Sequence, residues 1–172
     1  MAGDLDGLHA LACRPEVYRY LFDASAPSRQ FIAGRIEQGI VSAAACGLGM
    51  WRLEGPDAPY AGCVQLHPDV VGRWAEITYF LDPACWGKGL TVRMAWTVIA
   101  LAFCSGHIDT VMAGADAPNE ASFAVMRRLG MRFHRHVTYP LGAGAEYVLH
   151  KGDPGPQPRP EPMRFTHSLL RG

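Results

Sequence analysis

The chain has 172 residues, 49% of them hydrophobic, which suits one globular domain with a sizeable core. Sixteen basic residues balance sixteen acidic ones without a run of either sign, so nothing indicates a nucleic-acid or membrane partner. Five cysteines without a CxxC pair argue against a disulfide framework or a zinc site. The N-terminus lacks the regions of a signal peptide, and no apolar run is long enough to span a bilayer. We therefore expect a cytoplasmic protein.

Helices are predicted before the first strand. A short helix from Asp4 to Ala12 has its leucines on one face, and residues 15–21 form a further turn. Ser28 is placed to cap a longer helix that runs to Ala45. Two short strands follow, Leu48 to Leu53 and Tyr60 to Leu66, and the turn residues between them predict a hairpin.

The second half of the chain alternates strands with two helices. Strands are predicted at Trp74 to Leu81, Ile108 to Ala113, Phe133 to Tyr139 and Ala145 to His150, and helices at Gly89 to Phe103 and Glu120 to Leu129. The first of these helices has a predicted apolar stripe of Val92, Trp96, Ile99 and Phe103. This pattern predicts an α+β fold with a sheet of six or seven strands. The composition becomes Pro-rich after Lys151, so we expect a domain at 1–151 and a tail at 152–172.

Two glycines at a helix start suggest a phosphate site. Gly87 and Gly89 let the backbone approach a ligand closely, and the N–H groups from Gly87 to Thr91 have no partner within the helix. A Walker loop would need Ser or Thr after Lys88, where Gly89 stands. A Rossmann fingerprint would need a third glycine, where Val92 stands. The Walker motif therefore does not fit, and the match to the Rossmann fingerprint is weak, which disfavours a nucleotide-binding module.

Two longer segments resemble one family. AEITYFLDPACWGKGLT is similar to the fourth strand and pyrophosphate loop of GNAT acetyltransferases, in the branch that includes ribosomal-protein N-terminal acetyltransferases. PNEASFAVMRRLGMRF resembles the Asn-x-x-Ser helix of the same branch. The chain departs from the usual residues at Thr91, Arg93 and Met131. The resemblance implies a GNAT fold, with a mostly antiparallel sheet flanked by helices, and an N-acetyltransferase that uses acetyl-CoA as cosubstrate.

The resemblance also implies roles for particular residues. Acetyl-CoA would bind to the main chain of the splayed fourth strand, to the loop, and to the start of the later helix, at Phe80, Leu81, Trp86, Gly87, Lys88, Gly89, Leu90, Thr91, Asn119 and Ser122. Many members carry a proton-donating tyrosine where Met126 stands, so Ser122 becomes the candidate donor. As an alternative, Asn119 simply caps the helix.

Glu76 is the candidate general base, because the family places its strand beside the acceptor and burial would raise its pKa. The alternative for Glu76 is an ion pair with Arg73 or Arg135. His134 and His136 share one strand face, which is more typical of a solvated surface than of a metal site. No metal is therefore expected. Cys85 is interpreted as a packing residue, so no covalent intermediate through cysteine is expected either.

The acceptor is expected to be a primary amine that attacks acetyl-CoA directly within a ternary complex. The acidic residues are scattered in the sequence, which favours a peptide N-terminus or a small neutral amine over a polycation. A non-catalytic acyl-CoA-binding or sensing protein of GNAT fold is the alternative.

One edge strand of the sheet is predicted to be exposed unless another segment pairs with it. Relatives in this branch usually begin with a strand, whereas here a helix is predicted within a few residues of Met1, which leaves Leu48 to Leu53 as an exposed edge. The segment from Met163 to Leu169 alternates like a strand and would cover that edge, within one chain or by exchange in a homodimer. A disordered tail is the alternative.

Overall fold

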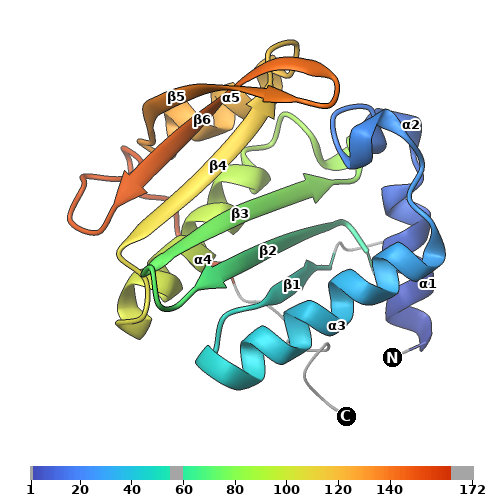
Figure 1. Ribbon diagram of the computed structural model, residues 1–172, viewed down its shortest axis with the longest axis horizontal. Helices are drawn as coiled ribbons and strands as arrows, with labels where there is room; N and C mark the ends of the chain where they lie inside the picture. Colours follow the sequence, from blue (N-terminus) through green and yellow to red (C-terminus); the bar gives the residue numbers. More distant parts are fainter. Residues whose placement is uncertain (1, 55–59, 164–172) are drawn as a thin grey trace.

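The computed structural model describes residues 2–54 and 60–163 (Figure 1). The helices are α1 (Ala2–Ala12), α2 (Pro15–Tyr18), α3 (Arg29–Cys46), α4 (Leu90–Ser105) and α5 (Glu120–Arg128), with 3-10 turns η1 (Phe22–Ala24) and η2 (Pro83–Cys85). The strands are β1 (Met50–Leu53), β2 (Gly62–Asp69), β3 (Trp74–Leu81), β4 (Thr110–Asp116), β5 (Arg132–Tyr139) and β6 (Gly142–His150). The elements predicted up to His150 are confirmed in order and type. No helix among the described residues is long and apolar enough to cross a membrane.

The six strands form one sheet in the order β1-β2-β3-β4-β6-β5. Every neighbouring pair is antiparallel except β3 with β4, which is parallel. Helices α4 and α5 cover one face, and α1 and α3 cover the β1 and β2 part of the other face (Figure 1). This arrangement confirms the predicted α+β class with a mostly antiparallel sheet.

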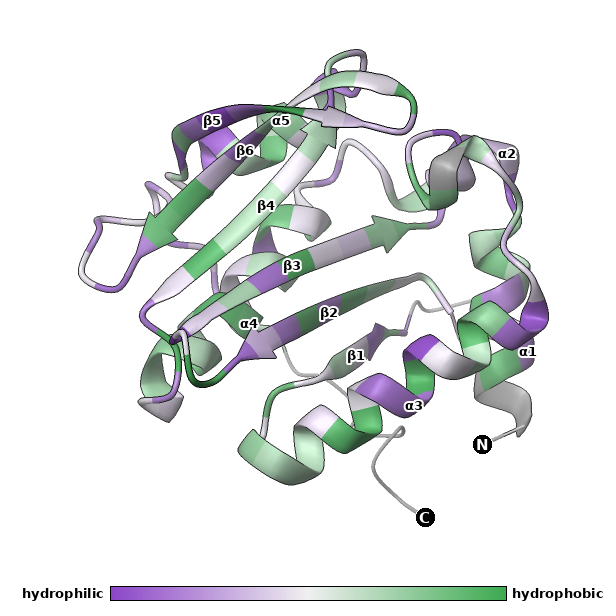
Figure 2. Cartoon of the chain, viewed as in Figure 1, coloured by the Kyte–Doolittle hydropathy of each residue, from purple (hydrophilic) through white to green (hydrophobic). Residues whose placement is uncertain are grey.

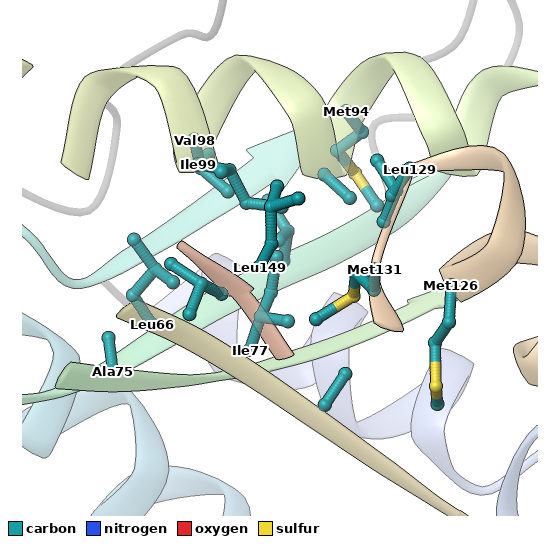
Figure 3. Close-up of a cluster of buried hydrophobic side chains, with 14 of the residues drawn as sticks. Leu66, Ala75, Ile77, Met94, Val98, Ile99, Met126, Leu129, Met131 and Leu149 are labelled. Carbon is teal, nitrogen blue, oxygen red and sulfur yellow. The ribbon is translucent and has the colours of Figure 1, made fainter. Parts of the chain in front are cut away.

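Helix α4 supplies much of the main core. Met94, Val98 and Ile99 point at the sheet, where they meet strand residues such as Leu66, Ile77 and Leu149 (Figure 3). Full burial of each such side chain is worth about 1.5–3 kcal/mol. The predicted stripe is only partly right, because Ile99 is buried whereas Val92, Trp96 and Phe103 are only partly buried. A helix that is apolar all round does not reveal which face it turns inward.

The parallel pair β3 and β4 separates after three residues. Trp74 to Glu76 pair with Thr110 to Met112, and β4 then continues along β6 as far as Asp116. The rest of β3, from Ile77 to Leu81, keeps its pairing with β2 only. Figure 1 shows the two strands diverging toward their C-terminal ends. The β4-facing backbone groups of β3 are therefore available to another partner.

The Pro-rich segment after β6 crosses the outer side of α4. The Asp153 carboxylate accepts a hydrogen bond from the N–H of His150 at 2.9 Å, and the Arg159 guanidinium lies 5.9 Å from the Trp96 ring centroid. The backbone N–H of Met163 donates to Thr97 Oγ1 at 3.0 Å. Strand β1 is an edge of the sheet, as expected. Beyond Met163, the predicted tail strand lies outside the described residues.

Candidate active site

A cavity of about 490 Å³ opens where β3 has left β4. Its walls come from four parts of the chain: α2 and the residues after it, the free end of β3, the loop into α4 with the first turn of that helix, and α5. The lining residues are Glu16, Val17, Arg19, Tyr20, Leu21, Tyr79, Phe80, Leu81, Trp86, Gly87, Gly89, Thr91, Val92, Asn119, Ala121, Ser122, Ala124, Val125 and Arg128.

The loop into α4 has the geometry of an anion site. Gly87 and Gly89 have φ values of +73° and +71°, in the left-handed region that favours glycine. Gly89 is the N-cap of α4, and it has no side chain that could satisfy the first N–H groups of the helix. A Cβ at either glycine would meet no atom of the described residues within 4 Å. Both glycines also line the cavity, so the loop borders open space that suits a phosphate group.

Two side chains hold this loop in place. Asp82 accepts a hydrogen bond from the N–H of Ala84 at 2.9 Å and forms an ion pair with Arg14 Nη1 at 2.6 Å. Trp86 Nε1 donates to the carbonyl oxygen of Leu81 at 3.0 Å. The ion pair between Asp82 and Arg14 joins the end of β3 to the corner between α1 and α2, so it fixes two walls of the cavity relative to each other.

Most of the residues predicted to bind acetyl-CoA line this cavity: Phe80, Leu81, Trp86, Gly87, Gly89, Thr91, Asn119 and Ser122. The side chains of Lys88 and Leu90 are directed elsewhere. Lys88 Nζ donates to the carbonyl oxygen of Ala84 at 2.8 Å, and Leu90 packs against the main core. Their backbone N–H groups are the parts that remain for a ligand.

Sequence reasoning missed two arginines in the cavity wall, Arg19 and Arg128. Each supplies a permanent positive charge that suits phosphate. Ser122, Val125 and Arg128 follow one another at intervals of three residues and so share one face of α5. That spacing was the available signal for Arg128, whereas nothing in the sequence brings Arg19 near the loop.

Asn119 caps α5 and also lies in the cavity wall. Its Oδ1 accepts a hydrogen bond from the N–H of Ser122 at 3.2 Å, so it caps α5, and the residue also lines the cavity. Because the cap uses the oxygen, the NH₂ group is the donor left for a ligand. Met126, one turn after Ser122, is 1% exposed and packs in the main core.

Glu76 lies on the sheet face opposite Ile77 and Leu81 and is not in the cavity wall. The ion pair considered for it is wrong, because Arg73 binds Asp109 at 2.6 Å and Arg135 binds Glu146 at 2.7 Å. The Glu76 side chain keeps contact with solvent, but partial burial raises the pKa of its carboxyl. The positive charge of Arg35 lowers that pKa, and the negative charge of Glu146 raises it.

Arg35 belongs to a small polar group on the same face. Its Nη2 lies 2.7 Å from His67 Nε2. Burial lowers the pKa of His67 to about 4, and the charge of Arg35 lowers it further in the same direction. His67 is therefore neutral at pH 7 and accepts the hydrogen bond from the guanidinium.

Three carboxylates that are scattered in the sequence gather around Tyr139. Burial raises the pKa of Tyr139 to about 12, and the charges of Glu146, Glu76 and Asp116 also raise it, against a lowering by Arg135. A Cβ at Gly114 would lie 2.0 Å from the Tyr139 hydroxyl oxygen, so this hydroxyl stands over the β4 backbone just beyond the last β3 pairing. Acidic residues that are scattered in the sequence are therefore clustered in space, contrary to the expectation from the sequence.

The remaining candidates lie away from the cavity. His134 and His136 are exposed on β5, which is hydrophilic along much of its length (Figure 2). Cys85 packs partly buried against the main core. Within residues 2–54 and 60–163, no three or more His, Cys, Asp or Glu side chains are grouped so as to hold a metal ion.

The free end of a strand, a glycine loop and a helix start thus meet at one cavity, which suits an extended ligand with a phosphate group. A family model described as acetyltransferase (GNAT) domain matches residues 1–132. The chain thus belongs to the GNAT acetyltransferase family and is an acetyl-CoA-dependent N-acetyltransferase.

Solved structures with the same fold include several acetyltransferases. RimL, a ribosomal L7/L12 alpha-N-protein acetyltransferase in complex with coenzyme A, is 17% identical with a TM-score of 0.74, covering 87% of this chain and 90% of that one. Spermidine N-acetyltransferase from Vibrio cholerae, with CoA and spermine, is 16% identical with a TM-score of 0.74, covering 89% and 93%. Aminoglycoside acetyltransferase AAC(6')-Ib, with coenzyme A, is 14% identical with a TM-score of 0.69, covering 88% and 91%.

Proposed function

We propose that this protein transfers the acetyl group of acetyl-CoA to a primary amine, either a peptide N-terminus or a small amine, by direct attack within a ternary complex. The observation that supports this most is the continuity of the cavity, which joins the glycine loop, the free end of β3 and the start of α5. One extended ligand with a phosphate end and a thioester end suits that shape.

Each wall of the cavity suits one part of acetyl-CoA. The N–H groups of the loop from Gly87 to Thr91 would hold the pyrophosphate, with Arg19 and Arg128 adding positive charge. The β4-facing backbone groups around Phe80 and Leu81, apart from the Leu81 carbonyl that Trp86 Nε1 occupies, would hydrogen-bond the amides of the pantetheine arm, as a neighbouring strand does. When bound, the cosubstrate supplies a thioester, whose carbonyl carbon accepts the amine.

The acceptor amine is proposed to approach from the opposite sheet face, where Glu76, Asp116 and Glu146 surround Tyr139. A primary amine is protonated at neutral pH, so these negative charges attract it. The amine must lose its proton before it attacks, and Glu76, whose pKa is raised, is the proposed base.

Direct attack is favoured over a covalent acyl-enzyme. None of the cavity-lining residues in the described part of the chain is a cysteine, and Cys85 is held in core packing beside the loop. Ser122 is the proposed hydrogen-bond donor to the leaving sulfur, because it lines the cavity at the first turn of α5.

The test is an acceptor screen with acetyl-CoA, in which release of the free thiol is followed. The panel should contain peptides with free N-termini, neutral monoamines, diamines and polyamines, and matched compounds whose amine is already acetylated as controls. Thiol release that depends on a free primary amine is expected. Tight CoA binding without release for any amine would instead support an acyl-CoA-binding protein without turnover.

A further inference from the structure

A largely buried tyrosine of β3 faces the cavity and has no part in the mechanism above. Strand alternation puts Tyr79 on the same side as Ile77 and Leu81, and both of these neighbours are buried in the main core. Tyr79 packs partly against that core and lines the cavity. It follows the last β3 residue that pairs with β4, so it stands where the strands have separated.

The Tyr79 hydroxyl reaches the first turn of α5. It donates to the carbonyl oxygen of Ser122 at 3.4 Å. This hydrogen bond is long, because O–H···O bonds are usually about 2.7–2.8 Å. A weakly held proton can turn to a stronger acceptor, and a thiolate formed beside Ser122 would be one.

The phenol keeps its proton at neutral pH. Burial raises the pKa of Tyr79 above its usual range, and the hydrogen bond to Ser122 only partly opposes this. A free cysteine thiol has a pKa of about 8.5 and a free phenol one of about 10. Next to a thiolate, Tyr79 therefore remains the donor of a hydrogen bond and does not give up its proton.

We infer that the Tyr79 hydroxyl stabilises the leaving CoA thiolate by a hydrogen bond, beside Ser122; this inference rests on the proposed function. In the reaction, the amine nitrogen bonds to the thioester carbonyl carbon, and the C–S bond breaks with its electron pair staying on sulfur. The amine gives one proton to Glu76 before it attacks, and the nitrogen loses a second proton to water once its bond to carbon has formed. The thiolate is held by Tyr79 until it leaves and takes a proton from water.

The decisive measurement is the pKa of the CoA thiol when CoA is bound, followed by the ultraviolet absorbance of the thiolate across pH. Wild type is expected to hold this pKa below that of free CoA, and Tyr79→Phe to return it toward the free value. Turnover in Tyr79→Phe should fall about 10- to 100-fold. Tyr147→Phe is the matched control, because Tyr147 packs partly buried against the main core outside the cavity wall and Phe preserves its ring. It should leave both measurements unchanged.

The outcomes distinguish the role of Tyr79 from the proposed function on which it rests. Phe keeps the ring that packs against the core, and melting curves check that the fold is intact. Tyr79→His supplies a second variant, which retains a donor and should hold the bound thiol pKa between those of wild type and Tyr79→Phe. Normal CoA binding with an unshifted thiol pKa in both variants would overturn the role of Tyr79 alone. Failure of wild type to bind CoA would overturn the proposed function as well.

Discussion

Gly89 allows the phosphate-binding loop to be tested with a charge. Its φ of +71° means that another residue there costs about 1–2 kcal/mol of backbone strain, although a Cβ would meet no described atom within 4 Å. Gly89→Glu also brings a carboxylate to the N-terminus of α4, where we propose that pyrophosphate binds. Two like charges about 4 Å apart repel by about 4 kcal/mol at an effective dielectric constant of about 20. That energy corresponds to a loss of CoA affinity of about 10³-fold.

Gly106 provides a matched control at the other end of the same helix. Its φ is +75°, and a Cβ there would also meet no described atom within 4 Å, but it is not in the cavity wall. Gly106→Glu should also lose stability, by about 2–8 °C in Tm for a chain of this size, and more than Gly89→Glu because a carboxylate is unfavourable at a helix C-terminus. Calorimetry with CoA should show lost binding for Gly89→Glu alone. If the two variants bind CoA equally well, the loop is not the phosphate site.

The acceptor face, α5 and the C-terminal segment each give a further prediction. Glu76→Gln should lower kcat/KM by about 100-fold or more and abolish the acid limb of its pH profile, and a variant that keeps this limb would exclude Glu76 as the base. A carboxyl whose pKa is raised by folding destabilises the folded protein once pH rises through that pKa and the group ionises. Glutamine stays neutral, so Glu76→Gln should melt no lower than wild type at pH 7. Ser122→Ala should lower kcat about tenfold without changing CoA affinity, whereas equal losses in both would indicate a ground-state contact. Truncation before Asp153 should reduce Tm more than truncation after Met163, which keeps the contacts with α4, and equal melting curves would contradict the packing seen here.

Features that depend only on residues close together in the sequence, such as strand period and helix caps, were predicted correctly. The period of the strand from Trp74 to Leu81 and the capping residue Ser28 are local signals, and both were right. The N–H of Phe31 donates to Ser28 Oγ at 3.1 Å, as capping requires. The phase of α4 was missed because its apolar residues surround the helix, so only the sheet beneath it decides which side is buried.

The parts of the site that sequence reasoning missed depend on residues far apart along the chain. Arg19 lies in the cavity wall because the chain at the start of α2 is held beside the end of β3, where Arg14 pairs with Asp82. Likewise, Glu76 and Glu146 act on one tyrosine because β4 lies between their strands. No periodicity or spacing in the sequence reports such neighbours.

The geometry of strand β3 would let two faces of one sheet serve the proposed reaction. Glu76 and Tyr79 are three residues apart, so they lie on opposite faces, about 10 Å apart along the strand at about 3.3 Å per residue. In a continuous sheet, the neighbouring strand would close the route between the two faces. Here the pairing with β4 stops at Glu76, and Gly114 on β4 leaves room for the Tyr139 hydroxyl. Under the proposed function, the separation of the strands opens the backbone where an amine deprotonated on one face would meet a thioester bound on the other.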